Sequence, residues 1–383
     1  MTIYFDNAAT TFPKPEEVYT TMEKVMRNCA NPGRSGHKMA LESGRIVYQT
    51  RELLAKLFHI QNPMQVVFTH NATDSLNLGI KGFLKKGDHV VTTSMEHNSV
   101  LRPLKALKDK EIIGVTIVKG DRQGNVSVED IEKSIQNNTK MIITTHVSNI
   151  IGTLLPIEEL GKMIRKHNLV YMVDASQSAG VYDIDVNKGN IDLLAFPGHK
   201  GLLGPQGTGG LYIREGIDLE PAREGGTGSQ SESLLQPQIM PDRYESGTHN
   251  TIGIAGLGAG VRFILEEGIE NIRGHEEMLT QRLIDGLMKI DGVTIYGPKD
   301  VKKQAAVVSI NIGQGDTSEI SFLLDQQYDI ACRSGLHCAP LAHKTIGTFE
   351  QGTVRLSMGY FNTIEEVDKV LFSIEEISKK FIN

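Results

Sequence analysis

The sequence predicts an α/β protein with a large domain, built on a mostly parallel sheet with helices on both faces, and a smaller α+β domain after it. Two observations lead to this fold class. Between residues 45 and 215, short apolar runs alternate with longer amphipathic stretches, and such alternation is typical of a parallel sheet covered by helices. After residue 250 the pattern changes to one long helical stretch followed by a shorter mixed region.

The apolar runs of the large domain are rich in Val, Ile, Thr and Tyr, as strands prefer. We expect strands at QVVFTH (65–70), HVVTTS (89–94), IIGVTIV (112–118), KMIITTHVS (140–148), LVYMVDAS (169–176), DLLAFPG (192–198) and GGLYIR (209–214). The stretches between several of them predict helices at 72–84, 99–108, 128–137 and 157–166. Ligands of such sheets usually bind beyond the carboxyl ends of the strands, so polar residues at those ends are candidate site residues.

The C-terminal part predicts the second domain. Residues 252–291 have a long helical pattern that Gly268 and Gly274 break. We expect it to be followed by strands near 293–296 and 305–312, a helix near 317–326, a strand near 328–332 and a final helix near 363–380. A boundary at residue 258 gives a large domain over 15–258 and a small domain over 259–383. Residues 1–14 are grouped with the small domain, although they fit either unit.

The composition limits the classes of function. The 383 residues include 40 basic and 46 acidic side chains, for a net charge of −6. Nucleic-acid-binding domains more often carry a basic excess, so no nucleic-acid partner is expected. Three cysteines are too few for a disulfide framework. The sequence has neither a signal-peptide pattern at its start nor an apolar stretch long enough to cross a membrane. We therefore expect a cytoplasmic protein with no membrane partner.

A glycine-rich segment, AFPGHKGLLGPQGTGGLYIR (195–214), contains the first candidate catalytic residue. Lys200 comes directly after an apolar run, where its amine can be desolvated. A desolvated amine has a lowered pKa, which suits Schiff-base chemistry. The alternative is that Lys200 is an ordinary solvated lysine.

A second candidate, Asp174, ends the buried-looking strand in LVYMVDASQS. An unpaired buried carboxylate is costly, and a pyridinium nitrogen is one partner that would stabilise it. An aspartate together with a Schiff-base lysine is the expected pair around pyridoxal 5'-phosphate (PLP). Gln177, three residues later, is placed to bond the phenolic oxygen of that ring. The alternative is that Asp174 caps a helix or a turn.

Two other strand ends carry candidate cofactor ligands. Ala72 and Thr73 follow the strand at 65–70 and begin a helix, where free backbone N–H groups favour phosphate. Simple helix capping is the alternative. His97, in SMEHNS after the strand at 89–94, is placed to stack on a cofactor ring or move protons, unless it is structural.

The whole chain resembles one family of enzymes. The matching segments, in order, are YFDNAATT (4–11), THNATDSLN (69–77), MEHNSVLRP (95–103), THVSNIIGT (145–153), VDASQSAG (173–180), GHKGLLGPQGTGGLY (198–212), ESGTHN (245–250) and RSGLHCAPL (333–341). They are similar to those of the class V aminotransferases among the fold-type I PLP enzymes. Within that family the resemblance is to cysteine desulfurases and selenocysteine lyases, more to the SufS-like group than to the NifS-like one.

The resemblance implies a role for each candidate residue. Lys200 would form the Schiff base with PLP, while Asp174, Gln177 and His97 would hold the ring and His97 would also act as an acid or base. The phosphate would be bound by Ala72, Thr73, His199 and, from the partner in a homodimer with shared active sites, Thr248. The substrate would be bound by Ala8, Asn149, Arg333 and Arg355, with Asn149 also touching the cofactor. No metal site is expected.

Cys338 is the residue that the resemblance makes decisive. It implies a desulfurase that converts L-cysteine to L-alanine, leaves a persulfide on Cys338 and passes the sulfur to an acceptor protein. A thiolate is stabilised by cationic neighbours, and we expect His337 and Arg333 to supply the positive charge next to Cys338. The open alternatives are a selenocysteine lyase acting on L-selenocysteine, another class V aminotransferase, a non-enzymatic scaffold, and a Cys338 that merely packs.

Three positions depart from the family pattern. Pro197 stands where a phosphate-bonding serine is common, and Leu336 stands where SufS-like enzymes usually have a histidine. Cys332 is an extra thiol six residues before Cys338. We interpret it as a packed strand residue, with resolution of a persulfide as the alternative.

Overall fold

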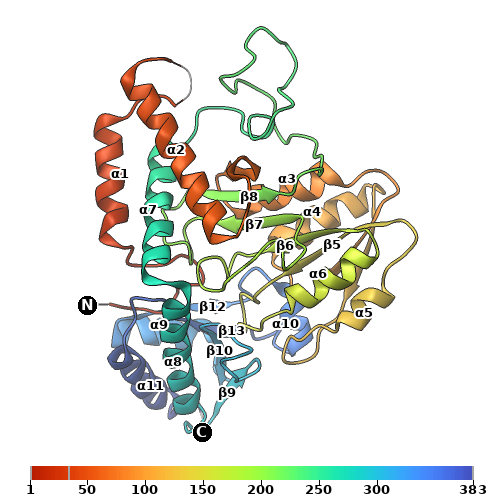
Figure 1. Ribbon diagram of the computed structural model, residues 1–383. Helices are drawn as coiled ribbons and strands as arrows, with labels where there is room; N and C mark the ends of the chain where they lie inside the picture. The colour runs from red at the N-terminus through yellow and green to blue at the C-terminus, as the bar shows by residue number, and fades with distance from the viewer. Residues whose placement is uncertain (1, 33–34, 382–383) are drawn as a thin grey trace.

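The computed structural model describes residues 2–32 and 35–381, and it contains a large and a small sheet with helices around both (Figure 1). The large sheet has seven strands in the order β2-β8-β7-β6-β5-β3-β4. Only β8 runs against its neighbours. The strands are β2 (Val66–Thr69), β3 (His89–Thr93), β4 (Gly114–Val118), β5 (Thr139–Thr145), β6 (Val170–Asp174), β7 (Leu193–Pro197) and β8 (Gly209–Ile213). Every strand predicted for this sheet is confirmed.

The predicted helices of the large domain are also present, as α3 (Ala72–Phe83), α4 (Asn98–Asp109), α5 (Val128–Lys133) and α6 (Ile157–Lys166). Helix α5 is shorter than expected. Its end is marked by Ser134, whose hydroxyl bonds the carbonyl of Asp130 at 2.8 Å, and the polar residues that follow form a turn instead.

Two further helices of this domain were not expected from the sequence. Helices α1 (Glu16–Asn28) and α2 (Lys38–Leu57) both pack against α7 (Thr251–Glu267) (Figure 1). The close approach depends on glycine, because a Cβ on Gly256 would lie 2.8 Å from Met22 and one on Gly258 would lie 2.5 Å from Thr50.

The small domain has an antiparallel sheet in the order β12-β13-β10-β9. Its strands are β9 (Val293–Tyr296), β10 (Val307–Ile312), β12 (Arg333–Gly335) and β13 (Thr353–Ser357), and its helices are α8 (Ile269–Leu287), α9 (Thr317–Tyr328), α10 (Pro340–Ile346) and α11 (Ile364–Ser378). β12, β13 and α10 were not expected. The strand predicted near 328–332 is shorter than expected, as β11 (Ile330–Ala331), and it pairs in parallel with β1 (Ile3–Tyr4).

The long helical pattern over 252–291 is broken once. Gly268, with φ of 89°, separates α7 from α8. The second expected break, at Gly274, is wrong, because that residue lies inside α8. A glycine costs a helix only about 1 kcal/mol, and α8 offsets this by burying Leu279 and Leu283.

The two sheets have separate apolar cores. Residues of α7 such as Leu257 and Val261 belong to the core of the large sheet, whereas Leu279 in α8 belongs to that of the small sheet together with Ile3 and Phe5. The expected boundary at residue 258 falls inside α7 and stays a prediction. The chain therefore passes from one core to the other along α8.

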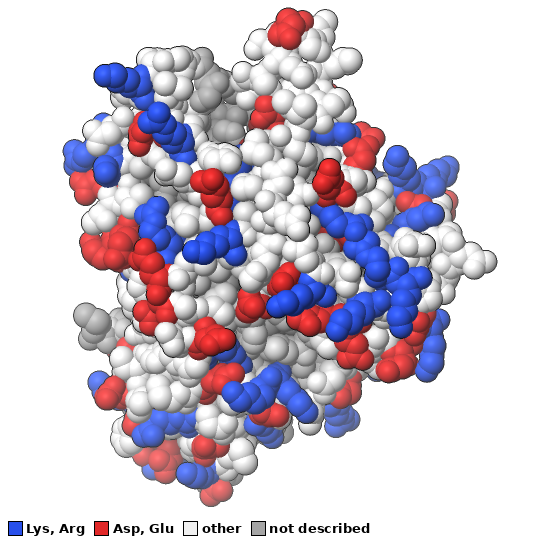
Figure 2. Space-filling model, viewed as in Figure 1, with Lys and Arg blue, Asp and Glu red and all other residues white. Residues whose placement is uncertain are grey.

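The surface offers no simple clue to function. On the face in Figure 2, basic and acidic side chains are interspersed over most elements. Within residues 2–32 and 35–381, none of the helices is long and apolar enough to cross a membrane.

Candidate active site

A cavity of about 250 Å³ lies where the ends of the large-sheet strands face the small domain. Most of the predicted site residues line it, although the predictions came from separate segments of the chain. These residues are Ala8, Ala72, Thr73, His97, Asn149, Asp174, Gln177, His199, Lys200, Arg333 and Arg355. Neither Cys338 nor Thr248 lines this cavity.

Lys200 enters the cavity from the segment that follows β7. Burial lowers the pKa of its amine from 10.5 to about 8, while the nearby carboxylate of Asp174 opposes that shift. The guanidinium groups of Arg355 and Arg333 lower the pKa further. Roughly a tenth of Lys200 is therefore an uncharged, nucleophilic amine at pH 7, far more than for an ordinary lysine.

Asp174 is the last residue of β6 and is 2% exposed. Its Oδ1 accepts a hydrogen bond from the Ser176 N–H at 2.9 Å and another from the Ser176 hydroxyl. No hydrogen bond from the described residues reaches Oδ2. This leaves one carboxylate oxygen available to a cationic group in the cavity.

Gln177 is held by the N-terminal segment. Its Nε2 donates to the carbonyl of Ala8 at 3.0 Å. This bond joins the end of β6 to the segment after β1, so Ala8 and Gln177 form one wall of the cavity together.

Two helix starts also face the cavity. Asn71 caps α3, because its side chain accepts the Asp74 N–H at 2.9 Å, and His97 caps α4 through the Ser99 N–H at 3.1 Å. The hydroxyls of Thr73 and Ser99 lie 2.8 Å apart between these starts. Free N–H groups and hydroxyls in this arrangement suit a phosphate. The Ser99 hydroxyl was not predicted, and it lines the same cavity as Pro197, which has no hydroxyl to donate.

Two histidines of the cavity are kept neutral. Burial lowers the pKa of His97 to about 4, although Asp174 opposes the shift. Burial likewise lowers the pKa of His199 to about 4, with Lys200 and Lys14 adding to the effect. In the part of the chain that the structure describes, no group bonds Nδ1 of His199. His97 is therefore neutral near pH 7, which suits stacking on a cofactor ring, and its lowered pKa makes it a weak base.

Arg355 places a positive charge at the back of the cavity. It lies in β13, directly opposite Arg333 of β12, and is 1% exposed. Its Nη2 donates to Oδ1 of Asp6 at 2.6 Å and its Nη1 to the carbonyl of Asn149 at 3.0 Å. Among residues 2–32 and 35–381, Nε of Arg355 has no partner. Asp6 was not predicted as a site residue, although it lies in the opening segment that carries the resemblance.

The Cys338 loop is an exposed turn fixed against the large domain. His337 and Cys338 both have left-handed backbone conformations, with φ of 47° and 59°. The Asn149 side chain donates to the carbonyl of His337 at 2.7 Å, and the Asn98 N–H donates to the carbonyl of Cys338 at 2.8 Å. Nη2 of Arg333 lies 3.8 Å from the Cys338 sulfur. The exposed thiol is thus held beside a cation that also lines the cavity.

The expectation that His337 would supply positive charge to Cys338 is wrong. His337 is buried, with Nε2 3.2 Å from the carbonyl of Arg333 and its ring stacked on His343. Burial lowers the pKa of His337 to about 3, helped by Arg355. The side chain therefore stays neutral, and Arg333 is the positive charge next to the thiol.

Neither Cys332 nor Leu336, two of the positions that depart from the family pattern, lines the main cavity. Cys332 packs against the core of the small sheet, and burial raises the pKa of its thiol to about 12. This fits a packed residue better than a nucleophile. Leu336 is 36% exposed next to the Cys338 turn.

Sequence reasoning missed a buried acid beneath the site. Glu96 lies between the end of β3 and His97, and its Oε1 accepts bonds from the Thr93 hydroxyl at 2.6 Å and the Thr145 N–H at 3.0 Å. No described residue bonds its Oε2. Burial raises the pKa of Glu96 to about 8. An acidic residue next to His97 at a strand end was the available signal.

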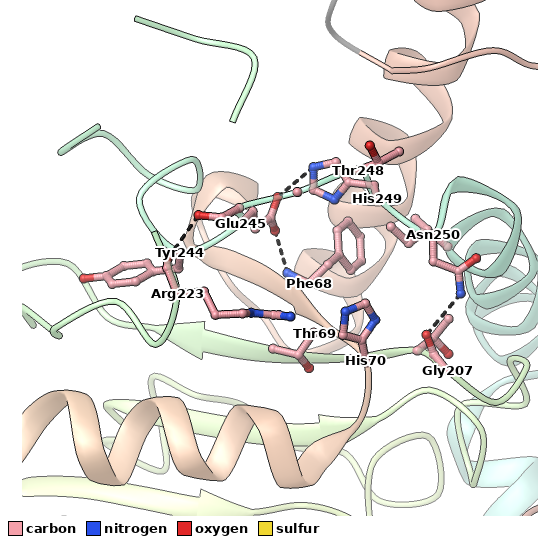
Figure 3. Close-up of a pocket in the computed structure, with 14 residues that line it drawn as sticks. Phe68, Thr69, His70, Gly207, Arg223, Tyr244, Glu245, Thr248, His249 and Asn250 are labelled. Carbon is pink, nitrogen blue, oxygen red and sulfur yellow. Dashed lines mark hydrogen bonds and ion pairs between the residues drawn. The ribbon is translucent and has the colours of Figure 1, made fainter. Parts of the chain in front are cut away.

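Thr248 lies in a different pocket, shown in Figure 3. There it accompanies Arg223, Glu245 and His70, and the Glu245 carboxylate accepts the N–H of Phe68. The chain neighbour of His70, Asn71, lines the main cavity. The two pockets are therefore adjacent, but Thr248 does not reach the Lys200 cavity of its own chain.

Comparison with known proteins gives a consistent result along the whole chain. A family model described as aminotransferase class V matches residues 3–370. A protein named "Probable cysteine desulfurase" from Pyrococcus abyssi is 37% identical, over 98% of this chain and 94% of that protein. A protein of the same name from Methanothermobacter thermautotrophicus is 35% identical, with the same coverage. A solved apo structure of a cysteine desulfurase from Thermococcus onnurineus has a TM-score of 0.94 and 37% identity, covering 99% of this chain and 95% of that one.

Proposed function

We propose, from the premise that this chain belongs to the aminotransferase class V family, that it is a PLP-dependent cysteine desulfurase. The observation that carries the proposal is the position of Cys338. Its backbone is fixed by Asn98 and Asn149 at the edge of a cavity that contains Lys200 and Asp174. A thiol held there can receive sulfur from a substrate bound in the cavity.

The residues of the cavity fit PLP. Oδ2 of Asp174 receives no bond from the described residues and is suited to a pyridinium N–H. The start of α3, with the Thr73 and Ser99 hydroxyls, is suited to the phosphate. Lys200 would hold the cofactor covalently, and His97 would stack on its ring. When bound, PLP supplies an electron sink for charge that develops at the substrate Cα.

The remaining steps belong to the side chains of this protein. Arg355, Asn149 and Ala8 would orient the carboxylate of L-cysteine, for which a planar guanidinium is well matched. Lys200 would take the proton from Cα. The Cys338 thiolate, stabilised by Arg333, would then attack the substrate sulfur. The C–S bond breaks, an S–S bond forms, and L-cysteine plus a protein thiol becomes L-alanine plus a protein persulfide.

The test is the production of alanine and sulfide from L-cysteine in the presence of dithiothreitol. We expect Cys338→Ser to abolish persulfide formation, while Cys332→Ser, six residues earlier, leaves it intact. Equal alanine production by the wild type and Cys338→Ser would contradict the role of Cys338. L-Selenocysteine measured in parallel distinguishes a lyase, for which Cys338→Ser would retain activity on the selenium substrate.

The proposal includes a homodimer in which Thr248 reaches the cofactor phosphate of the partner subunit. It is supported by the pocket around Thr248, which is adjacent to the Lys200 cavity, and by strongly exposed apolar side chains. These side chains lie on α1 and α2 and in the loop that projects at the top of Figure 1, and they include Met26, Met39, Leu41, Leu234 and Leu235. Light scattering that finds a fully active monomer would contradict shared sites.

The proposal also includes an acceptor protein that takes the persulfide sulfur from the exposed Cys338. Because that thiol must stay reduced between turnovers, we also propose that the protein works in a reducing compartment such as the cytoplasm.

A further inference from the structure

A second, smaller cavity lies on another side of Lys200. It has a volume of about 40 Å³ and is bounded by the large domain, the small domain and the N-terminal segment. Ala8, Gln177 and Lys200 line both this cavity and the main one. Lys200 therefore borders both the main cavity and a second, interdomain space that the proposed chemistry does not use.

One acidic side chain of α8 faces this interdomain cavity. Glu276 is 6% exposed and lines it. No hydrogen bond from the part of the chain that the structure describes reaches its carboxyl group. A buried carboxyl without a partner is costly, so Glu276 needs something in the cavity to bond.

The charged and titratable groups around Glu276 do not satisfy it. Arg273, one turn earlier on α8, is bound to Glu277 at 3.2 Å and to the carbonyl of Gln304 at 3.0 Å. Tyr182 lies under the Arg273 guanidinium. Lys200 borders the cavity across from α8. Burial raises the pKa of Glu276 to about 8, with Arg273 opposing the shift, so the group is protonated near neutral pH.

The cavity is suited to water. A water molecule needs about 10–15 Å³ of such volume and two to four polar partners, and the cavity has about 40 Å³. Besides Lys200 and Glu276, its polar lining residues are Asn7, Thr11, Gln177 and Ser357. Two or three waters would satisfy the Glu276 carboxyl in a space that Lys200 also borders.

We propose that Glu276 is a proton-relay residue that exchanges protons with Lys200 through water in this interdomain cavity. The inference rests on the proposed function, in which Lys200 takes the Cα proton of the substrate. After Lys200 takes the Cα proton, its ammonium group gives a proton to a cavity water. The carbonyl oxygen of the protonated Glu276 carboxyl accepts a proton from that water while its hydroxyl gives its own proton to a second water that exchanges with solvent. The reverse transfer returns a solvent proton to Lys200. No electrons change hands. The consequence is that the proton removed from Cα exchanges with solvent before Lys200 returns it.

The experiment uses L-cysteine deuterated at Cα, in ordinary water, and measures by mass spectrometry how much deuterium remains in the alanine. We expect the wild type to lose most of the label. Glu276→Gln keeps the shape of the side chain but cannot donate a carboxylic proton, and it should retain roughly ten times more label. The fraction retained is independent of the amount of active enzyme, so a merely structural role would not change it.

The matched control is Glu277→Gln. Glu277 is the next residue on α8, but it bonds Lys302 and Arg273 rather than the cavity, so its label loss should equal that of the wild type. A second variant, Ala306→Val, narrows the cavity from the small-domain side and should raise retention with Glu276 intact. Glu276→Asp should partly restore label loss.

A second readout does not depend on turnover. The infrared C=O stretch of a protonated carboxyl should be present near neutral pH, disappear as pH rises through about 8, and be missing in Glu276→Gln. Equal label retention in Glu276→Gln and Glu277→Gln would overturn the relay, as would the absence of the band in the wild type. If the wild type makes no alanine from L-cysteine, the proposed function fails instead.

Discussion

The wall around Asp174 and Lys200 and the loop around Cys338 border the same cavity but are built from different kinds of structure. Asp174 and Lys200 follow neighbouring parallel strands, so the pairing of β6 with β7 brings them together. Cys338 lies in an exposed left-handed turn that belongs to no sheet. Its position depends on bonds from Asn98 and Asn149 of the other domain.

The difference separates two tasks. Buried strand ends hold groups whose ionisation must be shifted, such as the Lys200 amine. An exposed turn suits a thiol that must meet both a substrate in the cavity and an acceptor outside. If this division is correct, variants of the wall and of the loop should fail in different ways.

The largest effect is expected for the wall. Lys200→Ala removes the base and the covalent anchor, so alanine production should fall by at least about a thousandfold. Alkylation of Cys338 by iodoacetamide should be unchanged, because the loop rests on other residues. A large change in that alkylation rate would mean that wall and loop are not independent.

The next prediction concerns Glu96, whose burial in the wall should make the free energy of unfolding depend on pH. The folded-state pKa of Glu96 is raised to about 8 from an ordinary value of 4.5. Its protonation therefore stabilises the fold fully below pH 4.5, and this contribution is lost as pH rises through 8. The loss is on the order of 5 kcal/mol. We expect Glu96→Gln to unfold at increasingly higher urea than the wild type between pH 5 and 8.

The control for that measurement is Glu17→Gln, on the exposed side of α1, whose difference from the wild type should not vary over this range. A constant difference for Glu96→Gln as well would show that Glu96 ionises normally.

The next effect is expected in the loop. The Arg333 guanidinium lies 3.8 Å from the Cys338 sulfur, and a nearby cation stabilises a thiolate. Arg333→Gln should slow alkylation of Cys338 about threefold, because the thiolate loses the nearby positive charge. Arg333→Lys keeps the charge and should restore most of the rate. Identical alkylation rates for the wild type and both variants would show that Arg333 does not activate the Cys338 thiol.

The smallest effect is expected for Cys332. Burial raises the pKa of its thiol to about 12, so it is protonated at neutral pH. Cys332→Ala should keep alanine production within about twofold and lower the free energy of unfolding by about 1 kcal/mol through lost packing. A tenfold slower transfer of sulfur to an acceptor would instead show that Cys332 resolves the persulfide.

The same division explains what the sequence could predict. Strand runs and the polar residues that end them are local patterns, so the seven strands and the cavity positions of Asp174, Lys200 and His97 followed from the sequence and the family resemblance. Contacts such as the Asn149 amide on the carbonyl of His337 join residues 188 positions apart. The burial of the His337 side chain depends on contacts of this kind. Its position next to Cys338 in the sequence does not reveal them.

The ion pair between Asp6 and Arg355 joins residues that lie 349 positions apart in the sequence. Arg355 is synthesised 349 residues after Asp6. At about 5–20 residues per second, Asp6 waits roughly 20 to 70 seconds for this partner. The part of the cavity around Arg355 therefore cannot assemble until the chain has been synthesised through β13.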